Sequence, residues 1–137
     1  MASHDSQDTD VILTLTRDII VRAYRLTDAP SLSKHANNKR IWDNLRNRMP
    51  HPYTVEDSKN WVTTCNLPEN GQASGPWTPE TGSTGPIIPI NYCIEVAGEP
   101  CGSIGLQFND PVEIYFRKAE VGYWLGEDYW ARALWVL

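Results

Sequence analysis

Residues 119–137 read Ala119-Glu-Val-Gly-Tyr-Trp-Leu-Gly-Glu-Asp-Tyr-Trp-Ala-Arg-Ala-Leu-Trp-Val-Leu137. Side chains of residues 119–125 alternate between two faces, which predicts a strand, and Gly126-Glu127-Asp128 ends it with a turn. We expect the first turn of a helix to follow. A strand that runs into a helix N-terminus is a natural anion site, because unpaired backbone N–H groups meet the positive end of the helix dipole there.

The composition indicates one folded domain. A chain of 137 residues can bury a single core, and 41% hydrophobic residues are too many for a wholly disordered protein. The formal net charge of −5 argues against nucleic acid as a partner, because nucleic-acid-binding proteins usually carry a basic excess. The three cysteines have no metal-type spacing, so we expect no metal.

The composition of the first ten residues predicts that they carry no targeting signal. Residues 1–10 are polar and acidic, which predicts a disordered tail and excludes a signal peptide. No apolar run approaches the ~18 residues that a membrane span needs. We therefore expect a cytoplasmic protein with no membrane partner, whose domain covers residues 11–137.

Local signals place helices after an N-terminal β region. Pro30 follows Asp28, a side chain that caps free N–H groups, and this pair predicts a helix start. Thr54-Val-Glu-Asp57 is a capping-box pattern that opens another helix. The expected strands cover residues 11–16 and 19–26, and the expected helices cover about 29–37, 39–45 and 54–65.

The segment of residues 66–89 contains five prolines and four glycines. This composition predicts an inserted loop, either a mobile insertion or a lid over a site. We favour the mobile insertion, because the segment offers few side chains that can pack. A meander follows, with strands at 90–96 and 101–108 joined by a turn at 97–100, before the strand of residues 119–125.

No nucleophile elbow, phosphate-binding P-loop or dinucleotide-binding fingerprint occurs, and His4, His35 and His51 are interpreted as non-catalytic. Four stretches in this order resemble the GNAT superfamily of acetyl-CoA-dependent N-acetyltransferases, specifically its ribosomal-protein N-terminal acetyltransferase-like branch. These stretches are Val21–Ala29, Ile41–Thr54, Gly98–Leu106 and Ala119–Trp130. The resemblance covers residues 19–137 except 66–89.

The resemblance implies an α/β (α+β) fold: the N-terminal half of a GNAT domain, ordered β-α-α-β-β-β. Its mixed, largely antiparallel sheet would carry helices packed on it and would end at the strand-to-helix junction. The last strand would splay from its neighbour, and backbone groups near Trp124 and Leu125 would bind the pantetheine arm and polarise the thioester carbonyl of acetyl-CoA.

The resemblance also assigns the remaining site residues. The loop of Trp130, Ala131, Arg132 and Ala133 would hold the pyrophosphate in backbone N–H groups. A substrate amine would attack the thioester directly, and Glu120 is the best carboxylate for the base. The alternative is that Glu120 only orients a neighbour or faces solvent.

The end of the chain departs from the family pattern. Ala131 and Ala133 stand where the family has glycine, and Trp135 stands where it has a small residue. The family's later strands, long helix and general-acid tyrosine would lie beyond Leu137. We therefore expect a partial domain, truncated after the start of the pyrophosphate loop.

Two functions follow from this interpretation. The first is acetyl transfer from acetyl-CoA to a peptide N-terminus or a small-molecule amine. The second is a catalytically inactive GNAT fragment that serves as an interaction module or has no function. An unpaired last strand would also favour self-association through the exposed sheet edge.

Overall fold

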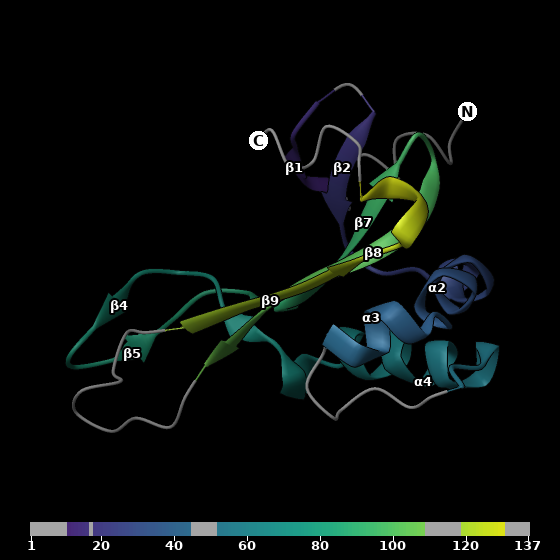
Figure 1. Ribbon diagram of the computed structural model, residues 1–137. Helices are drawn as coiled ribbons and strands as arrows, with labels where there is room; N and C mark the ends of the chain where they lie inside the picture. The colour runs from purple at the N-terminus through teal and green to yellow at the C-terminus, as the bar shows by residue number, and fades with distance from the viewer. Residues whose placement is uncertain (1–10, 17, 45–51, 109–118, 131–137) are drawn as a thin grey trace.

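The computed structural model describes residues 11–16, 18–44, 52–108 and 119–130 (Figure 1). Its main feature is a five-stranded sheet in the order β1-β2-β7-β8-β9. Its strands are β1 (Val11–Thr14), β2 (Ile19–Arg22), β7 (Asn91–Val96), β8 (Glu99–Phe108) and β9 (Ala119–Leu125). The α-helices of the described residues are α2 (Ala29–Ala36), α3 (Lys39–Asn44) and α4 (Val55–Asn66). The predicted α+β fold class is confirmed.

Every neighbouring pair of strands in this sheet is antiparallel, and the register determines which side chains share a face. Cys93 of β7 is opposite Ser103 of β8, which is opposite Trp124 of β9. Because strand side chains alternate between faces, these residues lie on one face, and their neighbours Ile94 and Leu125 lie on the other.

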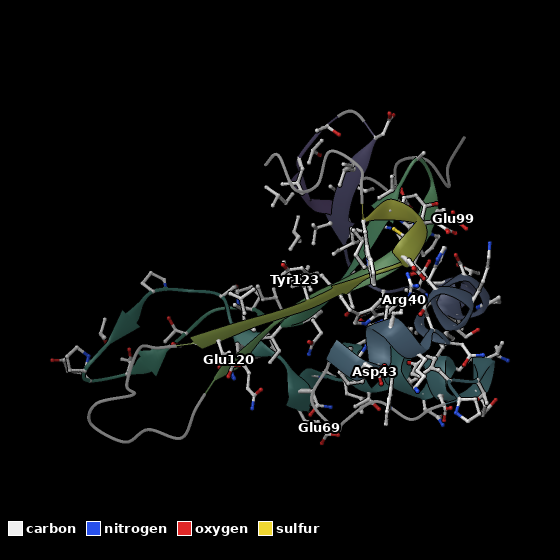
Figure 2. The ribbon with its side chains drawn as sticks, viewed as in Figure 1. Arg40, Asp43, Glu69, Glu99, Glu120 and Tyr123 are labelled. Carbon is white, nitrogen blue, oxygen red and sulfur yellow. The ribbon has the colours of Figure 1, made fainter. Side chains whose placement is uncertain are left out.

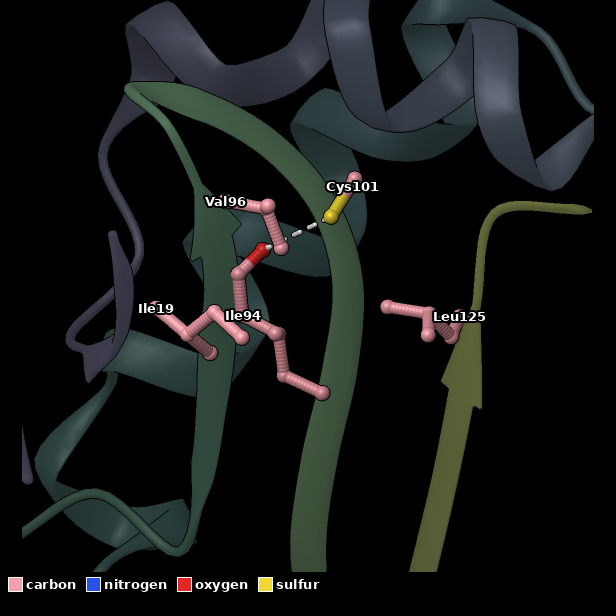
Figure 3. Close-up of a cluster of buried hydrophobic side chains, with 5 residues drawn as sticks. All are labelled: Ile19, Ile94, Val96, Cys101 and Leu125. Atoms are coloured by element: carbon pink, nitrogen blue, oxygen red, sulfur yellow. Dashed lines mark hydrogen bonds between the residues drawn. The ribbon is translucent and has the colours of Figure 1, made fainter. Parts of the chain in front are cut away.

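Each face carries its own hydrophobic cluster. On the helix side, Tyr24 and Cys93 pack with residues of α2 and α4, namely Leu32, Val62 and Cys65. The opposite cluster comprises Ile19, Ile94, Val96, Cys101 and Leu125 (Figure 3). Full burial of one such aliphatic side chain stabilises the fold by roughly 1.5–3 kcal/mol. The C-terminal residues of β9 therefore reach both clusters, Trp124 from one face and Leu125 from the other.

A buried ion network joins the sheet to the start of the helices. Arg22 of β2 is 1% exposed, and its guanidinium donates to both carboxylate oxygens of Asp28, at 2.8 and 2.7 Å. Its Nε donates to Glu95 of β7 at 3.0 Å. Burial alone would lower the pKa of Arg22, but the hydrogen bonds and charge of Asp28 raise it above its ordinary value. Arg22 therefore stays charged inside the fold.

The helix starts follow the local sequence signals. Asp28 ends the short 3-10 helix η1 (Leu26–Asp28) and accepts the backbone N–H of Arg25 at 2.8 Å, and α2 begins directly after it. The capping box of α4 is confirmed: Thr54 accepts the N–H of Asp57 at 3.1 Å, and Asp57 accepts the N–H of Thr54 at 3.0 Å. The second predicted strand ends at Arg22 instead of Leu26: residues 23–25 belong to no strand or helix, and η1 begins at Leu26.

Residues 66–89 contain more regular secondary structure than the predicted loop. After α4 come the 3-10 helix η2 (Pro68–Asn70) and two short antiparallel ribbons, β3 (Gln72–Ala73) with β6 (Ile87–Ile88) and β4 (Trp77–Thr78) with β5 (Gly82–Ser83). The β4–β5 end projects away from the helices (Figure 1). A Cβ at Gly75 would lie 2.2 Å from the carbonyl oxygen of Thr84. Glycine here allows close strand approach, whereas the composition of the segment predicted a mobile insertion with few side chains that can pack. That the segment is an insertion stays a prediction.

The other predicted boundaries hold to within a few residues, and the turn before β8 narrows to Ala97 and Gly98, both with positive φ. The expectations for residues 1–10, 45–51 and 109–118 lie outside the described residues. No helix in the described ranges is both long and apolar enough to cross a membrane. The division into a tail and a domain stays a prediction.

The ion network gives the first test. We expect Asp28→Ala to lower the free energy of unfolding by about 3 kcal/mol, because it leaves the buried Arg22 with only part of its charge partners. Urea denaturation measures this change. Asp43→Ala, which removes an exposed carboxylate from α3, is the control and should change stability by less than ~0.5 kcal/mol. Equal effects of the two substitutions would contradict the role of the network.

Candidate active site

The C-terminal end of β9 presents backbone groups at the edge of the sheet. Gly126 donates its N–H to the carbonyl of Cys101 at 2.7 Å, which fixes the phase of the β8–β9 ladder. Antiparallel ladders alternate between bonded and non-bonded pairs, so the backbone of Trp124 is directed toward β8 and that of Leu125 away from it. In the described part of the chain, β9 is the last strand on this side.

The indole of Trp130 lies at this same edge. Its Nε1 donates to the outward carbonyl of Leu125 at 2.6 Å. The ring also packs against the cluster that contains Leu125. The carbonyl oxygen of Leu125 thus accepts a hydrogen bond from the side chain of Trp130. The backbone N–H of Leu125 is the donor that this residue directs away from β8.

The turn after β9 fits tightly against α2. The 3-10 helix η3 (Glu127–Tyr129) follows Gly126, and a Cβ at Gly126 would lie 2.6 Å from Nδ1 of His35 and 3.2 Å from the carbonyl of Cys101. The ring of His35 also meets the ring of Tyr129 edge to face, with centroids 5.6 Å apart. Glycine is required at position 126 because the chain passes directly over a buried imidazole.

Glu99 connects this turn to α2 and β8 (Figure 2). Its carboxylate accepts a hydrogen bond from the hydroxyl of Tyr129, lies 3.2 Å from Nε2 of His35 and pairs with Lys34 at 3.6 Å. The bond from Tyr129, with smaller contributions from His35 and Lys34, lowers the pKa of Glu99. Its stabilising contribution is therefore present above the ordinary pKa of glutamate and is lost as pH falls through the lowered value.

A second, more exposed contact ties η3 to the helices. Asn38 donates to one carboxylate oxygen of Glu127 at 2.8 Å, and Arg40 pairs with the other at 2.5 Å. The hydrogen bond from Asn38 and the charge of Arg40 lower the pKa of Glu127. Because these groups are exposed to solvent, the pair contributes less than the buried contacts around His35.

The predicted base lies at the other end of β9. Glu120 is exposed and opposite Gln107, on the same sheet face as Trp124. Figure 2 shows Glu120 and Tyr123 at different points along β9 and on different sides of it. Glu120 lies four positions before Trp124 along the strand, a distance of about 13 Å. The structure therefore does not bring Glu120 into direct contact with the edge at Leu125.

The predicted site is described in part. Leu125 and Trp130 come together at the edge, whereas Trp124 places its side chain in the helix-side core. Ala131, Arg132 and Ala133 lie outside the described residues. Sequence reasoning missed His35, Glu99, Glu127 and Tyr129, because their contacts join elements that are far apart in the chain. Across the described ranges, no group of three or more His, Cys, Asp or Glu side chains is placed to hold a metal ion.

Comparisons with known proteins identify the domain. A family model described as an acetyltransferase (GNAT) domain matches residues 18–135. Among solved structures, a probable acetyltransferase gives a TM-score of 0.59 at 19% identity, over 88% of this chain and 58% of that one. A ribosomal L7/L12 α-N-protein acetyltransferase in complex with coenzyme A gives 0.57 at 18% identity, over 89% of this chain and 59% of that one.

A third similar structure is an acetyltransferase from Salmonella typhimurium that modifies the N-terminal serine of ribosomal protein L7/L12. It gives a TM-score of 0.56 at 18% identity, over 90% of this chain and 60% of that one. The chain thus spans less than two thirds of the length of these structures, and at such identities the likeness shows the fold. No curated protein matches the chain.

The contact between Gly126 and His35 gives a direct test. We expect Gly126→Ala to lower the free energy of unfolding by about 1–3 kcal/mol, because the added methyl group cannot fit without moving a buried ring or the backbone. Gly122→Ala is the matched control on β9, since its Cβ would meet nothing within 4 Å. Thermal denaturation of both variants measures the difference, and a neutral Gly126→Ala would rule out the tight fit.

Proposed function

Because this chain belongs to the GNAT acetyltransferase family, we propose that it takes part in acetyl transfer from acetyl-CoA to an amine, either a peptide N-terminus or a small-molecule amine. The observation that carries this proposal is the outward backbone N–H of Leu125 at the edge of the sheet. A fixed backbone donor stabilises negative charge on a carbonyl oxygen, as an oxyanion hole does. Bound acetyl-CoA would supply the thioester carbonyl.

The residues at the edge fit such a ligand. The amide groups of a pantetheine arm need backbone partners, and the residues of β9 that face outward offer them along the strand. The structure of a related fold in complex with coenzyme A supports the same choice of ligand. We propose that Leu125 binds the thioester end, with the backbone of Trp124 holding the strand against β8.

The pyrophosphate would be held after β9. We propose that Trp130, Ala131, Arg132 and Ala133 form this part of the site, with Arg132 supplying a positive charge and the other residues supplying backbone N–H groups. The hydrogen bond from the indole of Trp130 to the carbonyl of Leu125 supports a site that continues from Leu125 into this segment. No metal enters the proposal.

We propose Glu120 as the general base. Because Glu120 lies about 13 Å from Trp124 along the strand, it would act at the end of a proton relay: a water molecule beside the amine would take the amine proton and pass one of its own along a chain of waters to the carboxylate. The amine nitrogen then forms a bond to the thioester carbon, the carbon–sulfur bond breaks, and the sulfur leaves as a thiolate that takes up a proton. An overall charge of −5 favours a cationic acceptor such as a protonated amine.

The acceptor follows from the neighbours only by analogy. Two similar structures are named as ribosomal L7/L12 acetyltransferases that act on a protein N-terminus. We therefore propose a peptide α-amine as the first acceptor to examine, within the ribosomal-protein acetyltransferase branch of the family. Small-molecule amines are the second class.

Acetyl transfer is tested with the full chain, acetyl-CoA and a peptide that begins with serine, with the product measured by mass spectrometry. We expect the free peptide to gain one acetyl group and an N-terminally blocked copy to gain none. Glu120→Gln should lower kcat by about 10²-fold or more, as loss of a general base does. Glu80→Gln, on the exposed β4–β5 ribbon, is the control and should keep full activity.

The alternative function also has an observation in its favour. Leu106, Val121 and Tyr123 share one sheet face beside the β9 edge, and Val121 and Tyr123 are 59% and 53% exposed. An exposed edge with apolar side chains favours association. Sedimentation of the same protein separates the two functions: transfer by a monomer supports the enzyme, whereas association without transfer or coenzyme binding supports an inactive interaction module.

A further inference from the structure

The turn of residues 126–130 contacts one carboxylate of β8, that of Glu99, which also faces His35 of α2. We propose that Glu99 is a positioning residue, which fixes this turn through Tyr129 and His35 and thereby fixes the coenzyme-binding edge at Leu125. The part of this inference that concerns the coenzyme rests on the function proposed above. The part that concerns the turn stands on the contacts alone.

Glu99 joins three elements at one point. It begins β8, accepts from the hydroxyl of Tyr129 in η3 and faces His35 and Lys34 of α2. The next residue, Pro100, accepts the hydroxyl of Ser31 of α2 at 2.6 Å, which holds this end of β8 against the helix. The backbone that carries the Glu99 carboxylate is therefore fixed against α2, and the turn is bonded to this carboxylate through Tyr129.

His35 packs beneath the turn of residues 126–130. It is 6% exposed, its ring packs edge to face on Tyr129, and the backbone of Gly126 passes over its Nδ1. Its buried Nε2 makes no well-aligned hydrogen bond within the described residues, and the carboxylate of Glu99 faces it at 3.2 Å. A buried polar nitrogen carries a cost when it has no partner, so Glu99 is fixed in place by His35 as well as by Tyr129.

Three hydrogen bonds connect the position of Tyr129 to that of Leu125. Tyr129 donates its N–H to the carbonyl of Gly126 at 2.9 Å, and Gly126 donates its own N–H to Cys101 at 2.7 Å. The next residue, Trp130, donates its indole N–H to the carbonyl of Leu125 at 2.6 Å. Loss of the hydrogen bond from Tyr129 to Glu99 would therefore loosen Gly126, which follows Leu125, and Trp130, which bonds to its carbonyl.

Glu99 can be changed without opening the core. Its side chain is 37% exposed and belongs to neither hydrophobic cluster. Glu99→Gln keeps the size of the side chain and removes its charge. Tyr129→Phe keeps the aromatic ring and removes the hydroxyl that bonds to Glu99. Both changes target the hold on the turn and leave the packing of the sheet in place.

Amide hydrogen exchange of the full chain, followed by NMR without ligand, tests the turn. We expect Glu99→Gln and Tyr129→Phe to speed exchange of the amides of Gly126, Tyr129 and Trp130 by about five- to tenfold, the effect of losing one charge-assisted hydrogen bond. The amide of Ile94 in the central strand β7 should stay within twofold, which excludes global unfolding. The control Glu80→Gln should change none of these rates.

Calorimetric titration of the same proteins with coenzyme A tests the positioning role. We expect both variants to raise Kd about five- to tenfold and Glu80→Gln to leave it unchanged. Unchanged exchange rates of the turn amides would overturn the proposal that Glu99 fixes the turn, whatever Kd the titration with coenzyme A gives. Faster exchange with an unchanged Kd would overturn the positioning role.

Failure of the unaltered chain to bind coenzyme A would overturn the proposed function and the positioning role together. The exchange rates would still decide whether Glu99 holds the turn. The two failures are thus distinguishable, because one is measured without ligand and the other requires it.

Discussion

Within the residues that the structure describes, β9 pairs with β8 on one side only, and this pairing is the constraint on which the candidate site depends. The bond from Gly126 to Cys101 sets the phase of the ladder, so Trp124 turns its backbone inward and Leu125 turns its backbone outward. A shift of one residue would exchange these roles and would also move Leu125 out of its hydrophobic cluster. Packing and chemistry therefore require the same register.

The rest of the fold keeps this register in place. The buried network of Arg22, Asp28 and Glu95 holds β2 and β7 against the start of the helices. The bulge in β8 places Cys101 in the cluster of Leu125, where its Sγ donates to the carbonyl of Ile94. Burial raises the pKa of Cys101 to about 12, so the thiol stays protonated and acts as a packing residue.

Sequence reasoning found the features whose signals are local. The capping box of Thr54 and Asp57 and the alternation of residues 119–125 lie within a few residues, and both are confirmed. The burial of Arg22 was not foreseen, because one of its two carboxylate partners, Glu95, is 73 residues away. For the same reason His35, read correctly as a residue of a helix, gave no sign that it lies beneath Gly126. The ribbons of residues 72–88 were missed because glycine there permits close backbone contact.

The central claim is that the outward amide of Leu125 is the donor to the ligand. Titration of the ¹⁵N-labelled chain with coenzyme A, followed by amide chemical shifts, tests it most directly. The account predicts saturable shifts at Leu125 and at the residues of the following turn, with the amide of Ile94 in the sheet centre unmoved. Saturable binding that leaves the amide of Leu125 unperturbed, or no binding at all, would contradict it.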